Sequence, residues 1–237
     1  MTIDLRDKVV IITGAGRGIG RAIALGFAKE HARLVLASRS RSELERLRDE
    51  VKQGGVEAIA IPTDVTAEDQ VKNLIESAHR SYGRIDVLVN NAGIGIYSKV
   101  VEMKTEDFRG MFDLNVTGVF FCTRAVLPFM MKQNDGVIVN IASLAGRNAF
   151  IGGAGYCATK WALIGFARSL MLEVREHNIR VITICPGSVD TSFSHSTKGK
   201  ANILLAEDIA ETVLAALRMP SRAMVSEIDI RPTNPKQ

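Results

Sequence analysis

Short apolar segments alternate with longer segments of helical periodicity along most of the 237-residue chain. An apolar run bounded by Gly, Pro or Asp is typical of a strand that is buried on both faces. We predict such strands at residues 8–13, 33–38, 57–62, 86–93 (with its turn), 136–143, 180–187 and 224–230. The amphipathic segments between them predict helices that end near residue 30, cover 40–53, 67–82, 105–131 and 154–177, and run from 205 to 218.

Strands that alternate with helices indicate βαβ units, which build a parallel sheet with helices on both faces. The expected fold class is therefore α/β, with a doubly wound parallel sheet of about seven strands. The sequence contains no linker, repeat or low-complexity run, so we expect a single domain over residues 1–237. A polar loop over about 188–205 and a tail over 231–237 are expected to lack regular structure.

One predicted helix begins with a nearly apolar segment that contains a tyrosine and a lysine. The segment "GAGYCATKWALIGFA" covers residues 153–167 and places Tyr156 and Lys160 four residues apart. On a helix this spacing puts a phenol and an ammonium on one face, one turn apart. Taken alone, the pair is most simply a core tyrosine and a lysine whose amine extends to water. The motifs around it decide whether the pair does more.

The composition is that of an ordinary soluble protein and narrows the range of partners. Hydrophobic residues make up 46%, charged residues 24% and aromatic residues 5%, with a formal net charge of +4. Lys and Arg are dispersed, without the basic stripe or interleaved aromatics typical of nucleic-acid binding. We see no apolar run of membrane-spanning length, and "MTIDLRDKVV" lacks a signal-peptide pattern. We expect a soluble cytoplasmic protein with no nucleic-acid or membrane partner.

Three cysteines, Cys122, Cys157 and Cys185, are far apart in the sequence and show no CxxC or metal-ligand spacing. This pattern is typical of reduced thiols in a cytosol-like compartment. Their expected role is to fill small apolar spaces, and no metal site is predicted.

A glycine-rich segment, "TGAGRGIG", follows the first predicted strand. Gly14, Gly18 and Gly20 have the spacing GxxxGxG. Glycines at such a turn bring backbone N–H groups and a helix N-terminus against a pyrophosphate. Many helices start after a glycine and bind nothing, but this cluster lies between a buried strand and a helix near the N-terminus. That placement favours dinucleotide binding.

The residue expected to contact the adenosine ribose lies at the end of the second predicted strand. An NAD site would have Asp or Glu there, whereas this chain has Ser38 followed by Arg39, and Arg17 lies in the glycine turn. Two arginines without a carboxylate suit a ribose that carries a 2′-phosphate. Alone, Arg39 and Arg41 would be solvated residues leading into a charged helix, where Ser40 and Glu43 form a capping-box pattern. Beside the glycine turn, they predict NADP(H) as the preferred cofactor over NAD(H).

Several further motifs occur in a fixed order along the chain. They are "TGAGRGIG", Asp64-Val65, "NNAG" at 90–93, Asn115 in "LNVTG", Ser143 in "NIAS", "YCATK" at 156–160 and "PGSVDT" at 186–191. Together they resemble the short-chain dehydrogenase/reductase family over nearly the whole length. The resemblance implies a Rossmann-type fold and an NADP(H)-dependent oxidoreductase, which transfers a hydride between the nicotinamide and a carbonyl or secondary alcohol.

The resemblance also implies roles for individual residues. The implied catalytic residues are Ser143, Tyr156 and Lys160, with Asn115 in support. The implied cofactor-binding residues are Gly14, Arg17, Gly18, Ile19, Gly20, Ser38, Arg39, Asp64, Val65, Asn91, Ala92, Gly93, Tyr156, Lys160, Pro186, Gly187, Val189 and Thr191. We expect a mostly apolar substrate pocket lined by Ile94, Ile96, Tyr97, Leu144, Phe150 and Phe193.

Carbonyl reduction needs a proton as well as a hydride, and the pair on the helix suits that need. Tyr has an ordinary pKa of about 10, and a neighbouring ammonium favours the phenolate. We therefore expect Lys160 to lower the pKa of Tyr156. The resemblance further implies that Lys160 holds the nicotinamide ribose, that Ser143 hydrogen-bonds the substrate oxygen, and that Asn115 anchors a water in the proton path.

Two other functions remain open on the sequence. Many relatives are 3-oxoacyl-carrier-protein reductases, but their carrier-docking arginines align with Pro128 and Leu172 here, and "EIDIRPTNPKQ" replaces their usual C-terminal turn. A catalytically idle NADP-binding sensor or scaffold is the alternative from another class, although Ser143, Tyr156 and Lys160 are all present. We favour a carbonyl reductase for a small carbonyl or alcohol substrate.

The two long predicted helices, over 105–131 and 154–177, are apolar enough to bury a face against a second copy of the chain. The family resemblance implies assembly through these helices. We predict a homotetramer, with a homodimer as the alternative. The competing interpretation is that the apolar faces only pack on the sheet.

Overall fold

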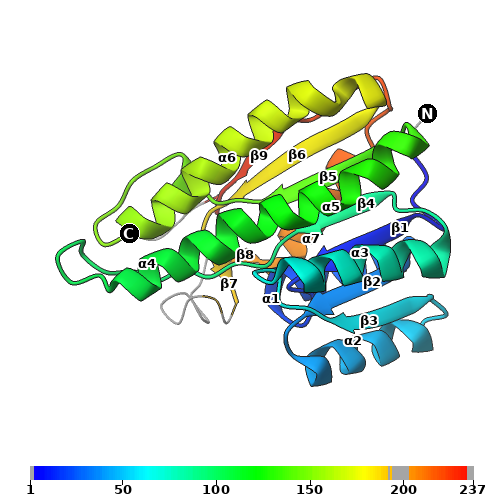
Figure 1. The fold of residues 1–237 in the computed structure, drawn as a ribbon, viewed down its shortest axis with the longest axis horizontal. Coiled ribbons are helices and arrows are strands. Elements are labelled where there is room, and N and C mark those ends of the chain that lie inside the picture. The colour runs from blue at the N-terminus through cyan, green and yellow to red at the C-terminus, as the bar shows by residue number, and fades with distance from the viewer. Residues whose placement is uncertain (1–2, 192, 194–202, 234–237) are drawn as a thin grey trace.

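The structure, a computed structural model, describes residues 3–191, 193 and 203–233, and its centre is a parallel sheet (Figure 1). The order in this seven-stranded sheet is β3-β2-β1-β4-β5-β6-β9, and all its pairings are parallel. The strands are β1 (Val9–Thr13), β2 (Arg33–Ser38), β3 (Ala58–Pro62), β4 (Val87–Asn90), β5 (Gly136–Ile141), β6 (Ile179–Pro186) and β9 (Glu227–Ile230). The predicted doubly wound sheet is confirmed.

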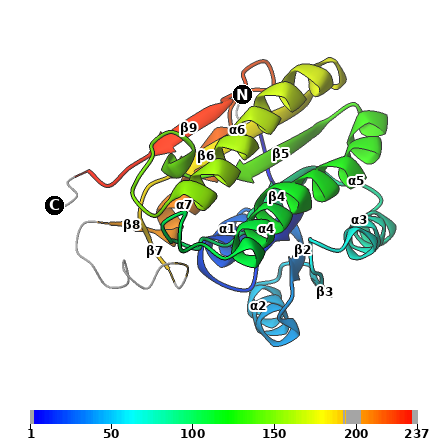
Figure 2. The ribbon, with the colours of Figure 1, turned by 60° about the vertical axis from the view of Figure 1, so that its left-hand side comes forward.

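Helices cover both faces of the sheet (Figures 1 and 2). One face carries α1 (Gly18–Lys29), α2 (Arg41–Gln53) and α7 (Ala206–Leu217), and the other carries α3 (Glu68–Tyr82), α5 (Gly118–Gln133) and α6 (Ala154–Val174). In β1, Val10 and Ile12 pack toward the first set, and Val9 and Ile11 toward the second. Since both faces are buried, consecutive positions are apolar, which explains why the strand segments show no alternation.

The helix predicted over 105–131 is not uniform. It consists of α4 (Thr105–Phe112), a π-helical turn η1 (Asp113–Thr117) and α5. The helix predicted to end at residue 177 ends at Val174, and a 3-10 turn η3 (Arg175–His177) follows. These differences concern hydrogen-bond pattern rather than the apolar periodicity from which the helices were predicted.

The loop predicted over 188–205 contains regular structure that the sequence did not indicate. β7 (Val189–Asp190) and β8 (Leu204–Leu205) pair with each other in a small second sheet. A 3-10 turn, η2 (Leu144–Gly146), follows β5. Two-residue strands have no periodicity to detect, because their pairing depends on contacts across the loop.

Among the described residues, the continuous helical segment formed by α4, η1 and α5 is the one that meets the length and composition of a membrane span, although no such span was expected from the sequence. Residues Thr105–Gln133 form 29 helical residues with a window of mean hydropathy 1.4, which satisfies length and composition for a span. A core helix of a soluble protein satisfies the same criterion. Here α5 packs against α3 and the sheet, so the finding is weak evidence for a membrane.

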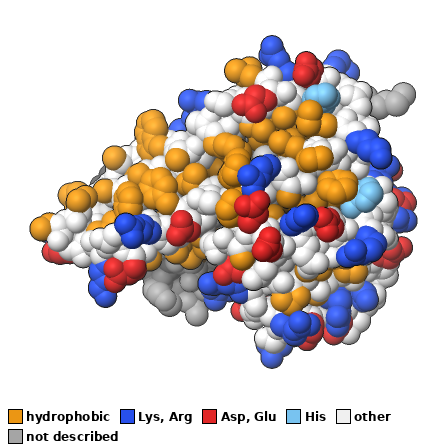
Figure 3. Space-filling model, in the orientation of Figure 1, with side chains coloured by type: hydrophobic (Ala, Val, Ile, Leu, Met, Phe, Trp, Pro, Cys, Tyr) orange, Lys and Arg blue, Asp and Glu red, His pale blue; other side chains and the backbone are white. Residues whose placement is uncertain are grey.

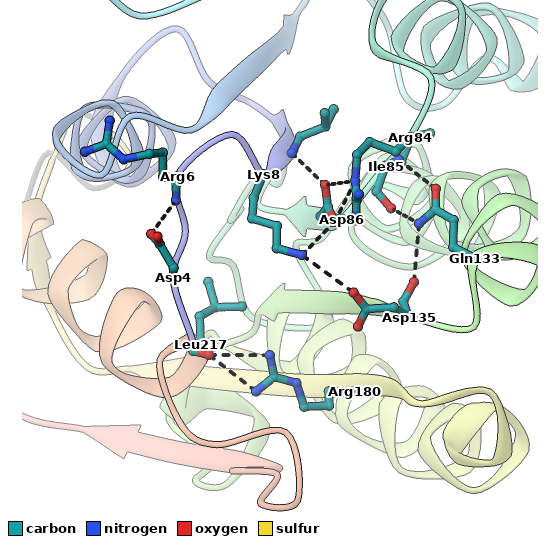
Figure 4. A network of polar contacts seen from close by, with 11 residues as sticks. Asp4, Arg6, Lys8, Arg84, Ile85, Asp86, Gln133, Asp135, Arg180 and Leu217 are labelled. Carbon is teal, nitrogen blue, oxygen red and sulfur yellow. Dashed lines mark hydrogen bonds and ion pairs between the residues drawn. The ribbon is translucent and has the colours of Figure 1, made fainter. Parts of the chain in front are cut away.

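A charged cluster fastens the amino ends of β1 and β4 (Figure 4). The buried carboxylate of Asp86 accepts hydrogen bonds from the Val9 N–H at 2.8 Å, Lys8 Nζ at 3.1 Å and Arg84 Nε at 2.9 Å. Burial acts to raise the pKa of Asp86, but the hydrogen bonds from Arg84 and Val9 and the charge of Lys8 hold it below its usual value. The cluster sets β1 against β4, whose carboxyl ends carry the candidate site.

Candidate active site

A cleft of about 1450 Å³ opens at the carboxyl ends of the central strands, the edge where parallel sheets bind ligands. It is lined by all the residues predicted to bind cofactor except Gly20, and by Ser143. Of the predicted substrate residues, Ile94, Tyr97, Leu144, Phe150 and Phe193 line it as well. Asn115, Gly20 and Ile96 are not among the lining residues. The sequence motifs, although spread over most of the chain, therefore meet in one place.

The glycine turn takes a shape that side chains would prevent. Gly14 and Gly18 have φ of 63° and 55°, in the left-handed region that favours glycine. A Cβ on Gly20 would collide with the Gly14 carbonyl and lie 2.5 Å from Asn91 Nδ2. Asn91 Nδ2 also donates to the carbonyl oxygens of Thr13 at 2.9 Å and Gly14 at 3.1 Å. Gly20 and Asn91 thus hold the turn in place. Asn91 also lines the cleft, whereas Gly20, predicted to contact the cofactor, does not.

The start of α1 faces this turn. Its N-cap, Arg17, makes no capping hydrogen bond with its side chain. Backbone N–H groups at a helix start lack partners within the helix and favour an anion. This end of the cleft therefore fits the pyrophosphate of a dinucleotide.

The end of the cleft next to the glycine turn and the end of β2 contains exposed Arg17 and Arg39. Asp64 Oδ1 accepts hydrogen bonds from Thr66 N–H at 3.0 Å and Thr66 Oγ1 at 2.7 Å. Burial acts to raise the pKa of Asp64, but the Thr66 hydrogen bonds and the Arg39 charge lower it on balance. Glu43 of α2 lines the same end. Sequence reasoning missed Glu43 because its position matched a capping pattern.

Tyr156 and Lys160 are both buried on α6 and line the cleft together with Ser143, which follows β5. Lys160 Nζ donates to the Ile141 carbonyl at 3.0 Å and lies 5.7 Å from the centroid of the Tyr156 ring. Ser143 Oγ accepts the N–H of Ala145 at 3.1 Å. The predicted serine, tyrosine and lysine are therefore brought together at one wall.

The electrostatics of this group differ from the prediction. Burial raises the pKa of Tyr156, and Tyr97 adds to this effect, while a hydrogen bond from Ser143 opposes it. Burial also lowers the pKa of Lys160 to about 8, against a smaller opposing effect of Cys185. The expected lowering of the Tyr156 pKa is thus corrected, because desolvation of the phenolate is the largest influence and Lys160 is not among the groups that shift this pKa. A phenol with a raised pKa remains protonated near neutrality and available as a proton donor.

Asn115 lies in the π-helical turn η1 and is buried. Its side chain is engaged by Ile94 and by Thr159 of α6, whose Oγ1 accepts from Asn115 Nδ2 at 3.1 Å. The carboxamide of Asn115 is therefore engaged by protein groups, and the water-anchoring role that the family resemblance implies for this residue stays a prediction. π-Helical turns are frequent at functional sites, where they redirect a side chain.

Aromatic rings form the outer wall near Tyr156. Tyr97 lies edge-on to Tyr156, with ring centroids 5.5 Å apart. The ring centroid of Phe150 lies 5.7 Å from that of Tyr97, and the ring centroid of Phe193 lies 6.1 Å from that of Tyr156. Tyr97, Phe150 and Phe193 are each nearly half exposed. The predicted pocket residues Tyr97, Phe150 and Phe193 therefore lie together beside Tyr156, and their contact with a substrate stays a prediction.

The sequence missed other lining residues for a simple reason. Arg231 and Pro232 also line the cleft, although they belong to the tail predicted to be irregular. No motif marked them, because they reach the cleft only through the pairing of β9 with β6. Most of the loop predicted over 188–205, namely residues 192 and 194–202, and the tail end 234–237 lie outside the described residues.

The fold and the cleft agree with the comparisons with known proteins, which identify an oxidoreductase. The chain belongs to the short chain dehydrogenase family, whose model matches residues 8–202. An uncharacterized oxidoreductase of Staphylococcus aureus (strain MW2) is 36% identical over 233 residues, 98% of this chain and 100% of that protein. Another, from Staphylococcus saprophyticus subsp. saprophyticus, is 37% identical over 244 residues, 98% of each chain.

Solved structures show the same similarity. An alcohol dehydrogenase from the archaeon Thermococcus sibiricus, complexed with 5-hydroxy-NADP, has a TM-score of 0.91 at 33% identity and covers 97% of this chain and 99% of its own. A metagenomic short-chain oxidoreductase in complex with NADP has a TM-score of 0.87 at 33% identity, with coverage of 98% and 100%. The family resemblance and the Rossmann-type fold predicted from the sequence are confirmed.

Proposed function

We propose that this chain is an NADP(H)-dependent carbonyl reductase, which transfers a hydride between the nicotinamide and a carbonyl or secondary alcohol of a small substrate. The observation that carries the proposal is the buried Tyr156–Lys160 pair, which lines the cleft beside Ser143. The two similar structures described above contain NADP or a derivative of it, which supports the choice of cofactor.

The lining residues fit a nicotinamide dinucleotide along the whole cleft. Gly14, Gly18 and Ile19 would hold the pyrophosphate, where the α1 N–H groups lack a side-chain cap. Ser38 and the two arginines would hold the adenosine ribose, and Asp64 and Val65 the adenine. The remaining predicted contacts would hold the nicotinamide half: Asn91, Ala92, Gly93, Tyr156, Lys160, Pro186, Gly187, Val189 and Thr191. The bound nicotinamide supplies or accepts the hydride.

The protein groups supply the rest of the chemistry. The Tyr156 phenol, protonated because burial raises its pKa, donates a proton to the oxygen that gains charge during reduction. Ser143 holds the same oxygen by a hydrogen bond in a partly dry cleft. The Lys160 ammonium stabilises the phenolate that remains after proton transfer. Asn115 acts as a positioning residue, because its side chain hydrogen-bonds Ile94 and Thr159 of α6 and does not line the cleft.

The substrate wall favours a carbonyl compound with apolar substituents. Ile94, Leu144, Phe150 and Phe193 present apolar surface to the cleft. The positions that would dock an acyl-carrier protein, Pro128 and Leu172, are exposed and uncharged here. This supports a free carbonyl substrate over a carrier-linked one.

The proposed reaction is tested by NADPH oxidation against a panel of ketones and aldehydes, with Tyr156→Phe as the decisive variant. We expect turnover by the unsubstituted protein and none by Tyr156→Phe, while NADPH binding persists because only a hydroxyl is removed. Tyr82→Phe on α3, distant from the cleft lining, is the matched control and should retain activity. Near-normal turnover by Tyr156→Phe would show that Tyr156 is not the proton donor. If the unsubstituted protein binds NADPH but turns over no carbonyl compound, the sensor hypothesis is favoured.

We also propose that the protein forms a homotetramer, with a homodimer as the alternative. We propose that it is located in the cytoplasm and that residues 1–237 form one domain that binds both cofactor and substrate. Hydrophobic side chains gather over α5 and α6 on the face shown in Figure 3. Among them Trp161 is 56% exposed and Leu172 59%, and Phe120 of α5 is also exposed. Light scattering on the protein and on Trp161→Glu tests this assignment, and a monomeric unsubstituted protein would refute it.

A further inference from the structure

A carboxylate from α2 reaches the glycine turn. A Cβ placed on Gly16 would lie 2.7 Å from Glu43 Oε2, 2.9 Å from Glu43 Cβ and 3.3 Å from Ser38 Oγ. The Glu43 carboxylate therefore lies against the turn, next to the residue that ends β2. Its backbone N–H is bound by Ser40 Oγ at 3.4 Å, so the helix cap does not depend on the Glu43 side chain.

The charges at this end of the cleft are balanced rather than positive. Arg17 and Arg39 line it together with Glu43 and Asp64. Asp64 is engaged by Thr66 and interacts with the charge of Arg39. Within residues 3–191, 193 and 203–233, neither Glu43 nor either arginine forms an ion pair. The Glu43 carboxylate is thus available to a ligand, and nothing in the described part of the chain neutralises it directly.

We infer that Glu43 contributes to cofactor specificity. In NAD sites a carboxylate at the end of the second strand faces the ribose, and here Glu43 of α2 supplies a carboxylate at that place instead. This inference rests on the proposed dinucleotide-binding function. A carboxylate accepts hydrogen bonds from ribose hydroxyls, which NADH presents at both the 2′ and 3′ positions. The same carboxylate repels a 2′-phosphate, whose charge Arg17 and Arg39 attract. Glu43 therefore weakens the preference for NADP(H) that the arginines create, and it lets NAD(H) bind.

The alternative is that Glu43 only packs on Gly16. A packing role would change the affinity for both dinucleotides in the same direction. An electrostatic role changes them in opposite directions, because only one of them carries the phosphate. The comparison of the two cofactors therefore separates the two explanations.

The experiment is calorimetric titration of the full-length protein with NADPH, NADH, adenosine 2′,5′-bisphosphate and adenosine 5′-diphosphate. Glu43→Gln removes the charge and keeps the shape, and Glu43→Ala is the second variant in case Gln retains the hydrogen bonds. Glu45→Gln is the matched control, because it causes the same change in net charge on the same helix. Glu45 pairs with Arg41 at 3.7 Å. Melting temperatures establish that each variant is folded.

We expect Glu43→Gln to tighten NADPH and the 2′,5′-bisphosphate about threefold and to weaken NADH about threefold, so that the ratio of dissociation constants shifts about tenfold. Glu43→Ala should shift the ratio in the same direction, and Glu45→Gln should leave it unchanged. If Glu43→Gln leaves the ratio of the two dissociation constants unchanged, or changes both constants in the same direction, the role of Glu43 is overturned. The proposed function stays intact as long as the unsubstituted protein binds the dinucleotides. If the unsubstituted protein binds neither dinucleotide, the proposed function itself fails, and this inference with it.

Discussion

Asn115 hydrogen-bonds both main-chain polar groups of Ile94. Its Oδ1 accepts the Ile94 N–H at 2.9 Å, and its Nδ2 donates to the Ile94 carbonyl at 2.8 Å. The same Nδ2 donates to Thr159, the residue before Lys160. One carboxamide in the π-helical turn therefore ties the loop after β4, which lines the cleft through Ile94, to the helix that carries the Tyr156–Lys160 pair.

Replacement of Asn115 by Ala should lower both stability and turnover. It leaves the polar groups of Ile94 without their partner, and an unsatisfied buried group costs about 1–3 kcal/mol. Urea denaturation should show a loss of this size, and kcat should fall more than the affinity for NADPH, because the cofactor contacts lie elsewhere. Asn73→Ala, at an exposed position of α3, is the control and should change neither quantity. Unchanged stability of Asn115→Ala would contradict the clamp.

The rate should depend on pH through Lys160. Burial lowers the pKa of Lys160 from 10.5 to about 8, so its ammonium is present below that pH and lost above it. If the ammonium is required, kcat/KM for NADPH should fall by about tenfold for each pH unit above about 8. The raised pKa of Tyr156 keeps the phenol protonated throughout this range.

Loss of stability does not account for such a fall. Because the folded pKa of Lys160 lies below its unfolded value, the unfolded chain binds more protons between about pH 8 and 10.5, and this group makes stability rise with pH there. Circular dichroism at each pH serves as the control. A kcat/KM that stays constant to about pH 9.5 would rule out a need for the charged lysine.

Local patterns were sufficient to predict most of the architecture. The segment of β5, "GVIVNI", is apolar enough to be recognised as a buried strand, and its bounds differ from the prediction by two residues at one end only. Tyr156 and Lys160 were placed on one helix face by spacing alone, and the structure has both buried on α6. Such features depend on residues within one turn or one strand, so a single sequence contains the information.

Features that depend on contacts between distant segments were missed. The π-helical turn around Asn115 has the same apolar periodicity as its neighbours. Glu43 matched a capping-box pattern, but only the Ser40 half is seen among the described hydrogen bonds, and its carboxylate turns to the cleft instead. The pKa of Tyr156 was predicted to fall because spacing shows the neighbouring charge, whereas burial, which prevails, is a property of the folded chain.

Asp86 should be a source of acid sensitivity. Its pKa is held below the usual value of 3.8, so its contribution to stability is full above about pH 4 and is lost as the pH falls through the lower folded pKa. Asp86→Asn leaves Lys8 and Arg84 without their buried partner and should cost about 3 kcal/mol at pH 7. The exposed pair of Arg48 and Asp49 provides the control, since Asp49→Asn should cost less than about 1 kcal/mol.

Stability of Asp86→Asn is best measured by urea denaturation between about pH 3 and 7, a range that begins below the usual pKa of 3.8. The difference from the unsubstituted protein should shrink as the pH falls, because protonation removes the same charge. A difference that is constant over this range would show that the carboxylate charge contributes nothing.

Tyr97 should contribute to substrate selection. Its ring lies against Tyr156 and Phe150 at the open side of the cleft. Tyr97→Ala should raise KM for a ketone with an aromatic substituent by about tenfold or more, as expected for loss of one large apolar contact, and change KM for acetone little. Phe108→Ala, at an exposed aromatic outside the cleft lining, is the control. Equal effects of Tyr97→Ala on both ketones would argue against an apolar substrate wall.

Arg39 should account for much of the preference for NADPH. Its guanidinium can form charge-assisted hydrogen bonds to a 2′-phosphate, each worth roughly 1.5–3 kcal/mol, so Arg39→Ala should weaken NADPH about tenfold to a hundredfold and NADH little. Ser38→Asp should act in the same direction by repelling the phosphate. Arg41→Ala is the control, since exposed Arg41 pairs with Glu45 outside the cleft lining. Equal weakening of NADPH and NADH by Arg39→Ala would show that Arg39 supports the cleft without recognising the phosphate.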